Sequence, residues 1–147
     1  SLVAGVYSAV HSIKSNISFG ISPQGNIDND LNMGADVAKW CSYSGYVDYI
    51  CPQIYYNFEN EALPFDKAVT NWKKLTEKGD VKLYAGLAVY KAGSDADSGS
   101  WEKSNDILKT QIEYLRSNGI NGFMLYSYDY LQSEQTETEM QNVMKVM

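Results

Sequence analysis

The chain has 147 residues, of which 44% are hydrophobic and 20% charged, and it carries a net charge of -6. This length and balance fit a single domain over residues 1–147 and exclude disordered, collagen-like and coiled-coil chains. The chain has twelve Lys and Arg against eighteen Asp and Glu, and its basic residues form no cluster. A phosphate backbone would be repelled, so nucleic acid is excluded as a partner. No apolar run approaches the ~18 residues that a transmembrane helix needs.

An amphipathic helix is predicted at the start of the chain. Its apolar residues at helical spacing are Val3, Val6, Val10 and Ile13. Four apolar runs rich in β-branched and aromatic residues follow, each before another helical pattern, and they are the predicted strands. They span residues 17–22, 47–56, 81–90 and 120–128. Because the runs are almost continuously apolar, we expect a parallel sheet covered on both faces. Pro52 cannot donate to a ladder and fits only a bulge or the end of its strand.

Stripes of apolar residues, three or four positions apart, predict a helix after each strand. In chain order these stripes are Val37, Trp40 and Cys41; Phe65, Val69, Trp72 and Leu75; Leu108, Ile112 and Leu115; and Met140, Val143, Met144 and Met147. Pro64 precedes the second helix, and Gly79 and Gly119 end the second and third. Thr136 and Glu139 predict a capping box on the last helix, whose methionines we expect in the core.

The order of these elements indicates an α/β fold with parallel strands. A helix in first position has no preceding strand beside which it could pack, so we infer that the chain begins inside a larger fold. Right-handed crossovers allow either an open flavodoxin-like sheet or one half of an eight-stranded (β/α)8 barrel. Hydrophobic periodicity is the same in both architectures.

The carboxyl ends of parallel strands converge on a common site in α/β folds. The residues at the four predicted ends are Ser22 and Gln24; Gln53, Tyr55, Tyr56 and Asn57; Tyr90 and Lys91; and Tyr126, Tyr128 and Asp129. Amides and tyrosyl hydroxyls pair with sugar hydroxyls, and aromatic rings cover the CH faces of sugars. This rim suits a polyhydroxylated ligand, and the alternative is that its residues only cap strands at a solvent surface.

Glycoside hydrolysis usually needs two carboxylates, one on each side of the scissile bond. Asp129 is the acid at a predicted strand end and is the candidate catalytic residue, with its partner unknown. Asp48 lies at the beginning of a strand, where a structural role is expected. Glu59 and Glu61 belong to a loop and are expected to be solvated. These residues do not make a complete acid pair.

The remaining polar residues indicate neither a metal nor a cofactor. Asp28, Asp30 and Asn32 resemble the start of a calcium loop, but the glycine comes one position late and the final Glu is missing, which favours a polar turn. His11 is the only histidine, and a surface or helix-packing role is expected. The two cysteines are expected to be free thiols. The sequence has no dinucleotide, P-loop or nucleophile-elbow motif.

Three segments of the sequence resemble motifs of a known protein family. They are FGISPQGN at residues 19–26, DVAKWCSYSGYVDYICPQIYYNF at residues 36–58 and LYAGLAVYKAG at residues 83–93. They are similar to the carboxyl-terminal half of a bacterial family of glycosyl-hydrolase-like barrels, which includes envelope proteins acting on peptidoglycan glycan strands. The run DYICPQIYY, with Trp40 ahead of Val47 and Asp48, is the most specific motif. GFMLYSYDYL at residues 122–131 resembles the last strand of the family.

The resemblance implies a (β/α)8 TIM barrel of which this chain supplies strands five to eight. The catalytic acids would lie at the end of strand four, in a motif that residues 1–147 do not contain. The substrate-binding residues that match family motifs are Ser22, Gln53, Tyr55, Tyr90 and Lys91, and the strand-end rim adds Gln24, Tyr56 and Tyr128. Gln24 stands where the family commonly has an aromatic residue, and Asp129 follows a strand whose end varies.

The function implied is the substrate-binding half of a glycoside hydrolase acting on a polysaccharide or on peptidoglycan glycan strands. The alternative is a non-catalytic carbohydrate-binding or scaffolding half-barrel. A glycan partner, no cofactor and an extracellular or cell-envelope location are expected. Four strands of a barrel leave two unpaired edges and one uncovered face, so we expect pairing with the missing half-barrel or with a second copy.

Overall fold

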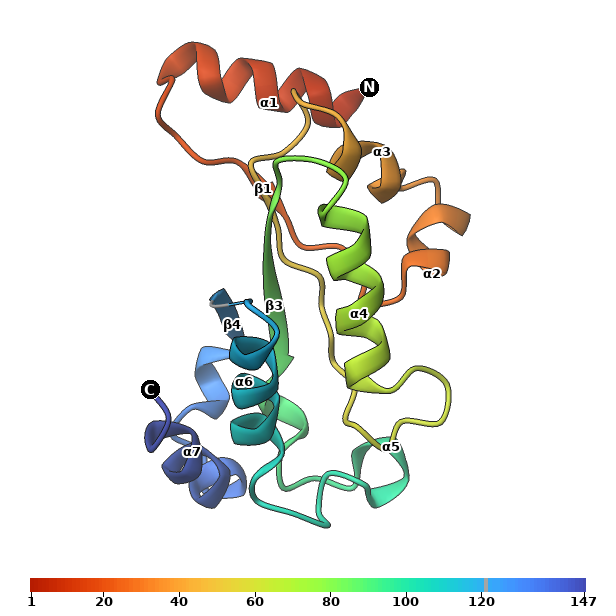
Figure 1. Cartoon of the computed structure of the whole chain (residues 1–147). Coiled ribbons are helices and arrows are strands. Elements are labelled where there is room, and N and C mark those ends of the chain that lie inside the picture. Colours follow the sequence, from red (N-terminus) through yellow and green to blue (C-terminus); the bar gives the residue numbers. More distant parts are fainter. Residues whose placement is uncertain (121) are drawn as a thin grey trace.

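The computed structural model describes residues 1–120 and 122–147, in which helices and strands alternate (Figure 1). The helices are α1 (Leu2–Ile13), α2 (Ile27–Asn32), α3 (Val37–Ser42), α4 (Phe65–Thr76), α5 (Ala96–Gly99), α6 (Ile107–Ser117) and α7 (Glu137–Met144). The strands are β1 (Gly20–Ile21), β2 (Tyr49–Ile50), β3 (Lys82–Ala88) and β4 (Gly122–Tyr126). Short 3-10 helices are η1 (Val89–Lys91), η2 (Tyr128–Tyr130) and η3 (Glu134–Thr136). The predicted α/β alternation is confirmed, and α2 and α5 are added to it.

The strands form a parallel sheet in the order β1-β2-β3-β4. Gly20 lies opposite Tyr49, and Tyr84 lies opposite Gly122. Each predicted run contains one strand, although β1 and β2 are only 2 residues long, and residue 121 of the fourth run lies outside the described residues. A flavodoxin-like sheet reverses its strand order at one point. Here the order follows the chain throughout, as it does for consecutive strands of a barrel.

The second strand ends before its proline. β2 stops at Ile50, and beyond it the Pro52 carbonyl oxygen accepts a hydrogen bond from the Gly86 N–H at 2.8 Å. Gln53 then forms isolated parallel bridges with Gln24 and Gly86. Pro52 therefore lies past the strand end, and backbone hydrogen bonds still carry this segment to the edge of the sheet.

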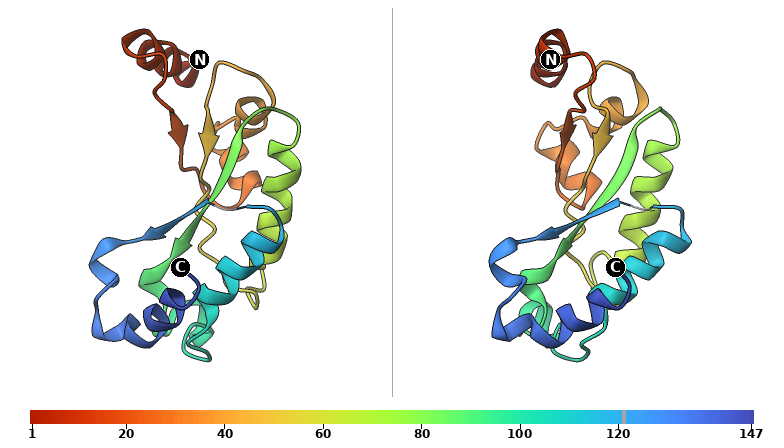
Figure 2. Two further views of the ribbon diagram at one scale, coloured as in Figure 1. Left: turned by 60° about the vertical axis from the view of Figure 1, so that its left-hand side comes forward. Right: turned by 90° about the vertical axis from the view of Figure 1, so that its left-hand side faces the viewer.

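Helices α3, α4 and α6 cover one face of the sheet (Figure 2). Helix α4 starts after Pro64, whose fixed φ suits a helix start, and its apolar residues recur at helical spacing. Phe65 and Trp72 of α4 are fully buried in the same core as Leu87 of β3. The Trp72 indole N–H donates to the Gly25 carbonyl oxygen at 2.9 Å, which ties α4 to the loop after β1.

The opposite face of the sheet carries tyrosines that lean over glycines of a neighbouring strand. A Cβ at Gly20 would overlap the Tyr49 ring, and a Cβ at Gly122 would overlap the Tyr84 ring. The centroids of the two rings are 5.3 Å apart. With Met124, which is 39% exposed, these residues line a cavity of about 380 Å³. The apolar runs predicted a sheet covered on both faces. In this chain that prediction is wrong for the face on which these tyrosines lie.

Helix α1 is connected to the sheet through Asp48, at the entrance to β2. None of the residues of α1 is buried. The Asp48 carboxylate accepts hydrogen bonds from the Phe19 N–H at 2.7 Å and the Tyr7 hydroxyl at 3.4 Å, and it lies 3.3 Å from His11 Nε2. The rings of Tyr7 and His11 stack with centroids 4.1 Å apart. These contacts agree with the structural role predicted for Asp48 and with the surface or helix-packing role predicted for His11.

The capping box predicted at the start of α7 is wrong. Thr136 is the N-cap residue, but its side chain makes no capping hydrogen bond. Glu139 points to another helix, where its carboxylate accepts the N–H of Leu108 in the first turn of α6. Glu139 therefore caps α6 from α7, and this contact joins two helices that are separate in the sequence.

Two further local predictions need correction. The methionines of the last helix were predicted to lie in the core. Met140 packs against the core, but Met144 and Met147 are 67% and 66% exposed. Residues 28–32 form part of helix α2 instead of a turn, because Asn26 accepts the backbone N–H groups of Asp28 and the following residue.

The two thiols are free, as predicted, and both are buried. Cys41 lies on α3, and Cys51, which falls within a predicted strand, lies directly after β2. Burial raises the pKa of Cys41 to about 12 and that of Cys51 to about 11, so both are protonated at neutral pH. In the part of the chain that the structure describes, no helix combines the length and the apolar character needed to cross a membrane.

Candidate functional site

Three tyrosines from successive strand ends meet at the carboxyl edge of the sheet. Tyr55 follows β2, Tyr90 lies in η1 after β3, and Tyr126 is the last residue of β4. The Tyr55 and Tyr126 rings are stacked, with centroids 5.6 Å apart and planes 19° apart. Tyr90 sets its ring edge-on to both, at 5.8 Å from Tyr55 and 6.0 Å from Tyr126. We call these three residues the tyrosine cluster.

The tyrosine cluster has one accessible member and two that are partly buried. Tyr126 is 50% exposed, whereas Tyr55 and Tyr90 are half-buried. Burial raises the pKa of Tyr55 to about 12, and the neighbouring Tyr126 and Tyr90 add to the shift. Burial also raises the pKa of Tyr90, with a further contribution from Asp97. These two hydroxyls are neutral at physiological pH and can each donate and accept hydrogen bonds.

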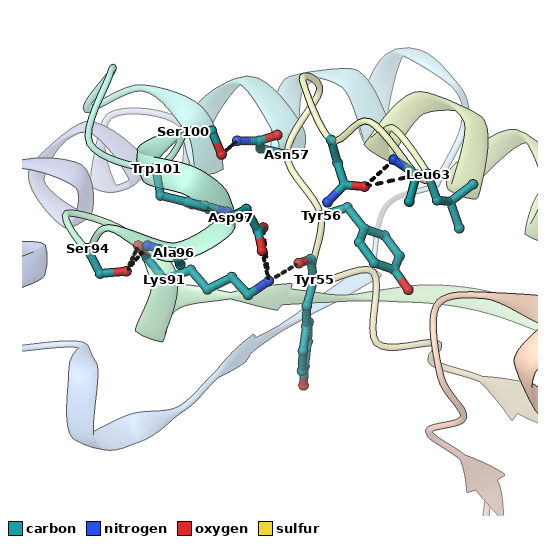
Figure 3. Close-up of polar contacts among 12 residues, drawn as sticks. Tyr55, Tyr56, Asn57, Leu63, Lys91, Ser94, Ala96, Asp97, Ser100 and Trp101 are labelled. Atoms are coloured by element: carbon teal, nitrogen blue, oxygen red, sulfur yellow. Dashed lines mark hydrogen bonds and ion pairs between the residues drawn. The ribbon is translucent and has the colours of Figure 1, made fainter.

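Lys91 is fully engaged beside this cluster. Its Nζ donates to the Tyr55 carbonyl oxygen at 2.8 Å and to both carboxylate oxygens of Asp97, at 3.0 and 3.1 Å (Figure 3). The Trp101 indole N–H donates to the same carboxylate at 2.8 Å. An ammonium group has three N–H donors, and these contacts use all three. Lys91 therefore connects the segment after β2 to the segment after β3.

Asp97 and Trp101 are site residues that the sequence did not reveal. Asp97 has φ 50° and Ser98 has φ 60°, so two consecutive non-glycine residues adopt the left-handed conformation. Asp tolerates this conformation better than most residues, but no spacing in the sequence marks the position. Trp101 lies outside every predicted helical stripe and is fully buried. The contact with Lys91 exists only because α5 folds back onto η1.

The predicted glutamines and Ser22 join the first two strand ends. Gln53 Nε2 donates to the Ser22 carbonyl oxygen at 3.2 Å, and Gln53 also bridges to Gln24. Gln24 is held in turn, because its N–H donates to Asp30 at 3.0 Å and its Oε1 accepts from Asn29 at 3.4 Å. The structure thus brings Ser22, Gln24 and Gln53 together at one part of the edge.

Tyr56 and Asn57 differ from Tyr55 in their surroundings. Figure 3 shows the Tyr55 and Tyr56 rings pointing in different directions from consecutive positions. The Tyr56 carbonyl oxygen accepts from Gln111 Nε2 at 2.7 Å, and burial raises the pKa of its hydroxyl. Asn57 is buried and donates to the Ser100 hydroxyl at 2.6 Å. Asn57 therefore ties the loop after β2 to the segment after α5.

The fourth strand end is the most exposed part of the rim. Tyr128 is 83% exposed and, with the exposed Asp129, belongs to η2. Tyr130 of the same turn reaches Tyr90, with centroids 6.2 Å apart. Asp129 thus stands in solvent, while the carboxylate of Asp97 is held by Lys91 and Trp101. These two acids do not form the pair that glycoside hydrolysis requires.

Metal chemistry has no support from the described side chains. Within residues 1–120 and 122–147, no three His, Cys, Asp or Glu side chains are grouped so that they could hold a metal ion. The groups that the edge does offer are aromatic faces, neutral hydroxyls and amides. Such groups bind a neutral, hydroxylated ligand by stacking and hydrogen bonding.

Known proteins similar to this chain are glycosyl hydrolases. Residues 1–103 match the model of the family Glycosyl hydrolase-like 10. Glycosyl hydrolase DigH of Escherichia coli is 30% identical over 154 aligned positions, which cover 92% of this chain and 35% of DigH. Glycosyl hydrolase YngK of Bacillus subtilis is 29% identical over 112 positions, covering 65% of this chain and 22% of YngK. No solved structure matches the chain.

The chain spans about a third of the length of its relative DigH. The matched family region runs through β1, β2 and β3 and includes Gln53, Tyr55 and Lys91. The order of parallel strands and the motifs in these residues agree with this match. The chain belongs to the Glycosyl hydrolase-like 10 family.

Proposed function

We propose that this chain is the substrate-binding half of a (β/α)8 glycoside hydrolase barrel that acts on a polysaccharide or on a peptidoglycan glycan strand. The observation that carries the proposal is the tyrosine cluster, formed at the ends of three successive parallel strands. Active sites of such barrels lie at this end of the strands. The names of the relatives DigH and YngK add support for glycoside chemistry.

In this proposal the exposed Tyr126 stacks against the CH face of a sugar ring. Hydroxyls of the tyrosine cluster and the amide of Gln53 hydrogen-bond to sugar hydroxyls. Hydrolysis itself needs one carboxylic acid to protonate the leaving oxygen and a second carboxylate as base or nucleophile. Both would come from the part of the barrel that precedes residue 1. A cell-envelope or extracellular location goes with such a substrate.

A non-catalytic glycan-binding half-barrel is the second candidate. It is favoured by the state of the two acids at the rim, because Asp97 is held by Lys91 and Trp101 and Asp129 is exposed in η2. The two candidates differ in the full-length protein. Release of reducing ends from a glycan that the protein also binds supports the hydrolase, whereas binding without release supports the second candidate.

Binding is tested first by replacing Tyr126 with Ala. We expect the affinity for an N-acetylglucosamine tetramer, measured by calorimetry, to fall about tenfold, because a stacking face of roughly 1.4 kcal/mol is lost. A cellotetraose of equal length shows whether the acetamido group contributes. Tyr43→Ala is the matched control, since Tyr43 is 66% exposed next to the end of α3. Equal affinity of Tyr126→Ala and the unmodified chain would contradict the proposed site.

Pairing through the open face of the sheet is the second testable part of the proposal. The tyrosine face with exposed Met124 and the outer edges of β1 and β4 would contact the other half-barrel or a second copy. We expect the 147-residue chain to associate with rising concentration in sedimentation velocity. Met124→Lys should weaken this association, whereas Met33→Lys, at a 75% exposed position at the end of α2, should not. A chain that stays monomeric at every concentration would rule out self-pairing.

A further inference from the structure

We propose that Asp97 is a positioning residue for the tyrosine cluster: through Lys91 it fixes the backbone of Tyr55 and thereby the place of the Tyr55 ring. This inference rests on the proposed function, because the ring matters for glycan binding only if the cluster is the binding site. It assigns a role to a residue that touches neither the proposed sugar nor the ring itself.

Lys91 joins the Asp97 carboxylate to the backbone of Tyr55. The two oxygens of Asp97 lie 3.0 and 3.1 Å from Lys91 Nζ, and Nζ lies 2.8 Å from the Tyr55 carbonyl oxygen. The side chains of Lys91 and Asp97 are only 15% and 25% exposed, so water screens this ion pair weakly. Two of the three ammonium donors of Lys91 bind Asp97 and the third binds the Tyr55 carbonyl oxygen. Separating Lys91 from Asp97 therefore breaks two hydrogen bonds.

The Lys91 contact adds to the hydrogen bonds that hold the segment around Tyr55, where the Ile54 N–H donates to the Gly86 carbonyl oxygen at 3.0 Å. Tyr55 lies beyond the end of β2, and its N–H donates to the Gln53 carbonyl oxygen within its own segment. The Lys91 contact binds its carbonyl oxygen to a different strand end. Figure 3 shows the Tyr55 carbonyl oxygen at the Lys91 ammonium and the Tyr55 ring extending away from it, so a shift of this peptide would move the ring.

The ring of Tyr55 has a narrow place to occupy. The Tyr55 ring lies over Gly86, where a Cβ would come within 3.4 Å of its Cε1 atom. It stacks on Tyr126 and meets the edge of Tyr90. A displaced Tyr55 would therefore disturb the Tyr126 face that is proposed to receive the sugar.

The conformation of Asp97 is costly without these contacts. Its φ of 50° lies in the left-handed region, which costs free energy for a residue with a Cβ, although less for Asp than for most others. The Trp101 indole, fully buried, and Lys91 both bind the carboxylate and hold the residue in this conformation. The side chain of Asp97, and not the local backbone preference, therefore maintains the contact.

The test is to replace Asp97 with Gly, which relieves the backbone and removes the carboxylate. We expect Asp97→Gly to keep a cooperative unfolding transition, to bind the N-acetylglucosamine tetramer about tenfold more weakly, and to lose part of the near-ultraviolet circular dichroism of its tyrosines. Asp97→Asn keeps one acceptor oxygen and should recover part of both signals. The matched control is Ser98→Gly, since Ser98 has φ 60° in the same loop. It should behave as the unmodified chain.

Each outcome decides between the two proposals. Unchanged affinity and dichroism in Asp97→Gly, with Tyr126→Ala weakened, would overturn the positioning role and leave the binding site intact. An equal loss in Ser98→Gly would assign the effect to loop flexibility and would also overturn it. If the unmodified chain does not bind the glycan, the proposed function fails, and the dichroism comparison alone still tests whether Asp97 positions the tyrosines.

Discussion

Replacing Gly93 with Ala should lower the free energy of unfolding by about 2 to 5 kcal/mol, which is the sum expected for a left-handed residue with a Cβ and an overpacked contact. Gly93 has φ +69°, and a Cβ there would overlap the Gln135 carbonyl oxygen. Gln135 Nε2 donates to the carbonyl oxygens of Tyr90 at 3.0 Å and Ala92 at 2.8 Å. The substitution would therefore push η3 away from η1, beside the tyrosine cluster.

Urea unfolding followed by far-ultraviolet circular dichroism measures this effect. Gly5→Ala is the matched control, because Gly5 lies within α1 with no neighbouring atom within 4 Å of the added Cβ. It should raise the free energy of unfolding by roughly 0.5 to 1 kcal/mol through the better helix propensity of Ala. A Gly93→Ala chain as stable as the parent would show that η3 can move without loss.

The stability of the chain should fall as the pH rises from about 4.5 to above 7, owing to Glu139. Its side chain is almost fully buried, with 2% of the residue exposed. Burial raises the pKa of Glu139 from its ordinary 4.5 to about 7, Asp106 adds to this, and the backbone N–H groups of Leu108 and Ile107 oppose it. The folded chain therefore keeps a proton that the unfolded chain releases near pH 4.5.

The sign follows from linkage. Between pH 4.5 and 7 the folded state binds more protons than the unfolded state, so the free energy of unfolding decreases with rising pH. The rise from 4.5 to about 7 corresponds to about 3 kcal/mol, lost in full once the pH exceeds 7.

Urea titrations at several pH values test this prediction with Glu139→Gln, which cannot ionise and keeps an oxygen for the Leu108 N–H. Relative to this variant, the unmodified chain should lose about 3 kcal/mol between pH 4 and 8. Glu137→Gln, at an exposed position of the same helix, serves as the control and should follow the unmodified chain. Parallel pH curves for all three chains would disprove the role of Glu139.

Local patterns predicted the elements whose cause is local. The stripe that includes Phe65 and Trp72 gave α4 because burial on one side of a helix needs only that spacing. The strand runs were placed correctly, but their length was not. Pro52 and the partners of Gln53 decide where β2 ends, and those partners lie in the segment after β1 and in β3. The order of the strands within the sheet could not be predicted, because a flavodoxin-like sheet and a half-barrel have the same hydrophobic pattern. Only the observed strand pairing distinguishes the two architectures.

The contacts that were missed do not follow from sequence spacing, whether the partner is distant, as for Glu139, or only four to six residues away, as for Asp97. Glu139 fits a capping box by spacing, yet it binds α6, 31 residues away. Asp97 is one acid among many in the sequence, and its role appears only where Lys91 and Trp101 converge on it. Tyr55 and Tyr90 were predicted as binding residues from a family motif, and the predicted sugar contacts stay a prediction. The contacts of Tyr55 and Tyr90 with each other and with Tyr126 could be seen only in the folded structure, because the three residues follow different strands.

The tyrosines that lean over glycines on the open face also restrict how the sequence can change. If β4 shifted by two residues against β3, Met124 would stand where Gly122 now leaves room for the Tyr84 ring. The pair therefore selects one register. A larger residue at position 122 becomes acceptable only with a smaller one at 84, and positions 20 and 49 are related in the same way. Paired replacement at these positions, with a gain in volume on one strand and a loss on the next, is the evolutionary pattern that this geometry should impose.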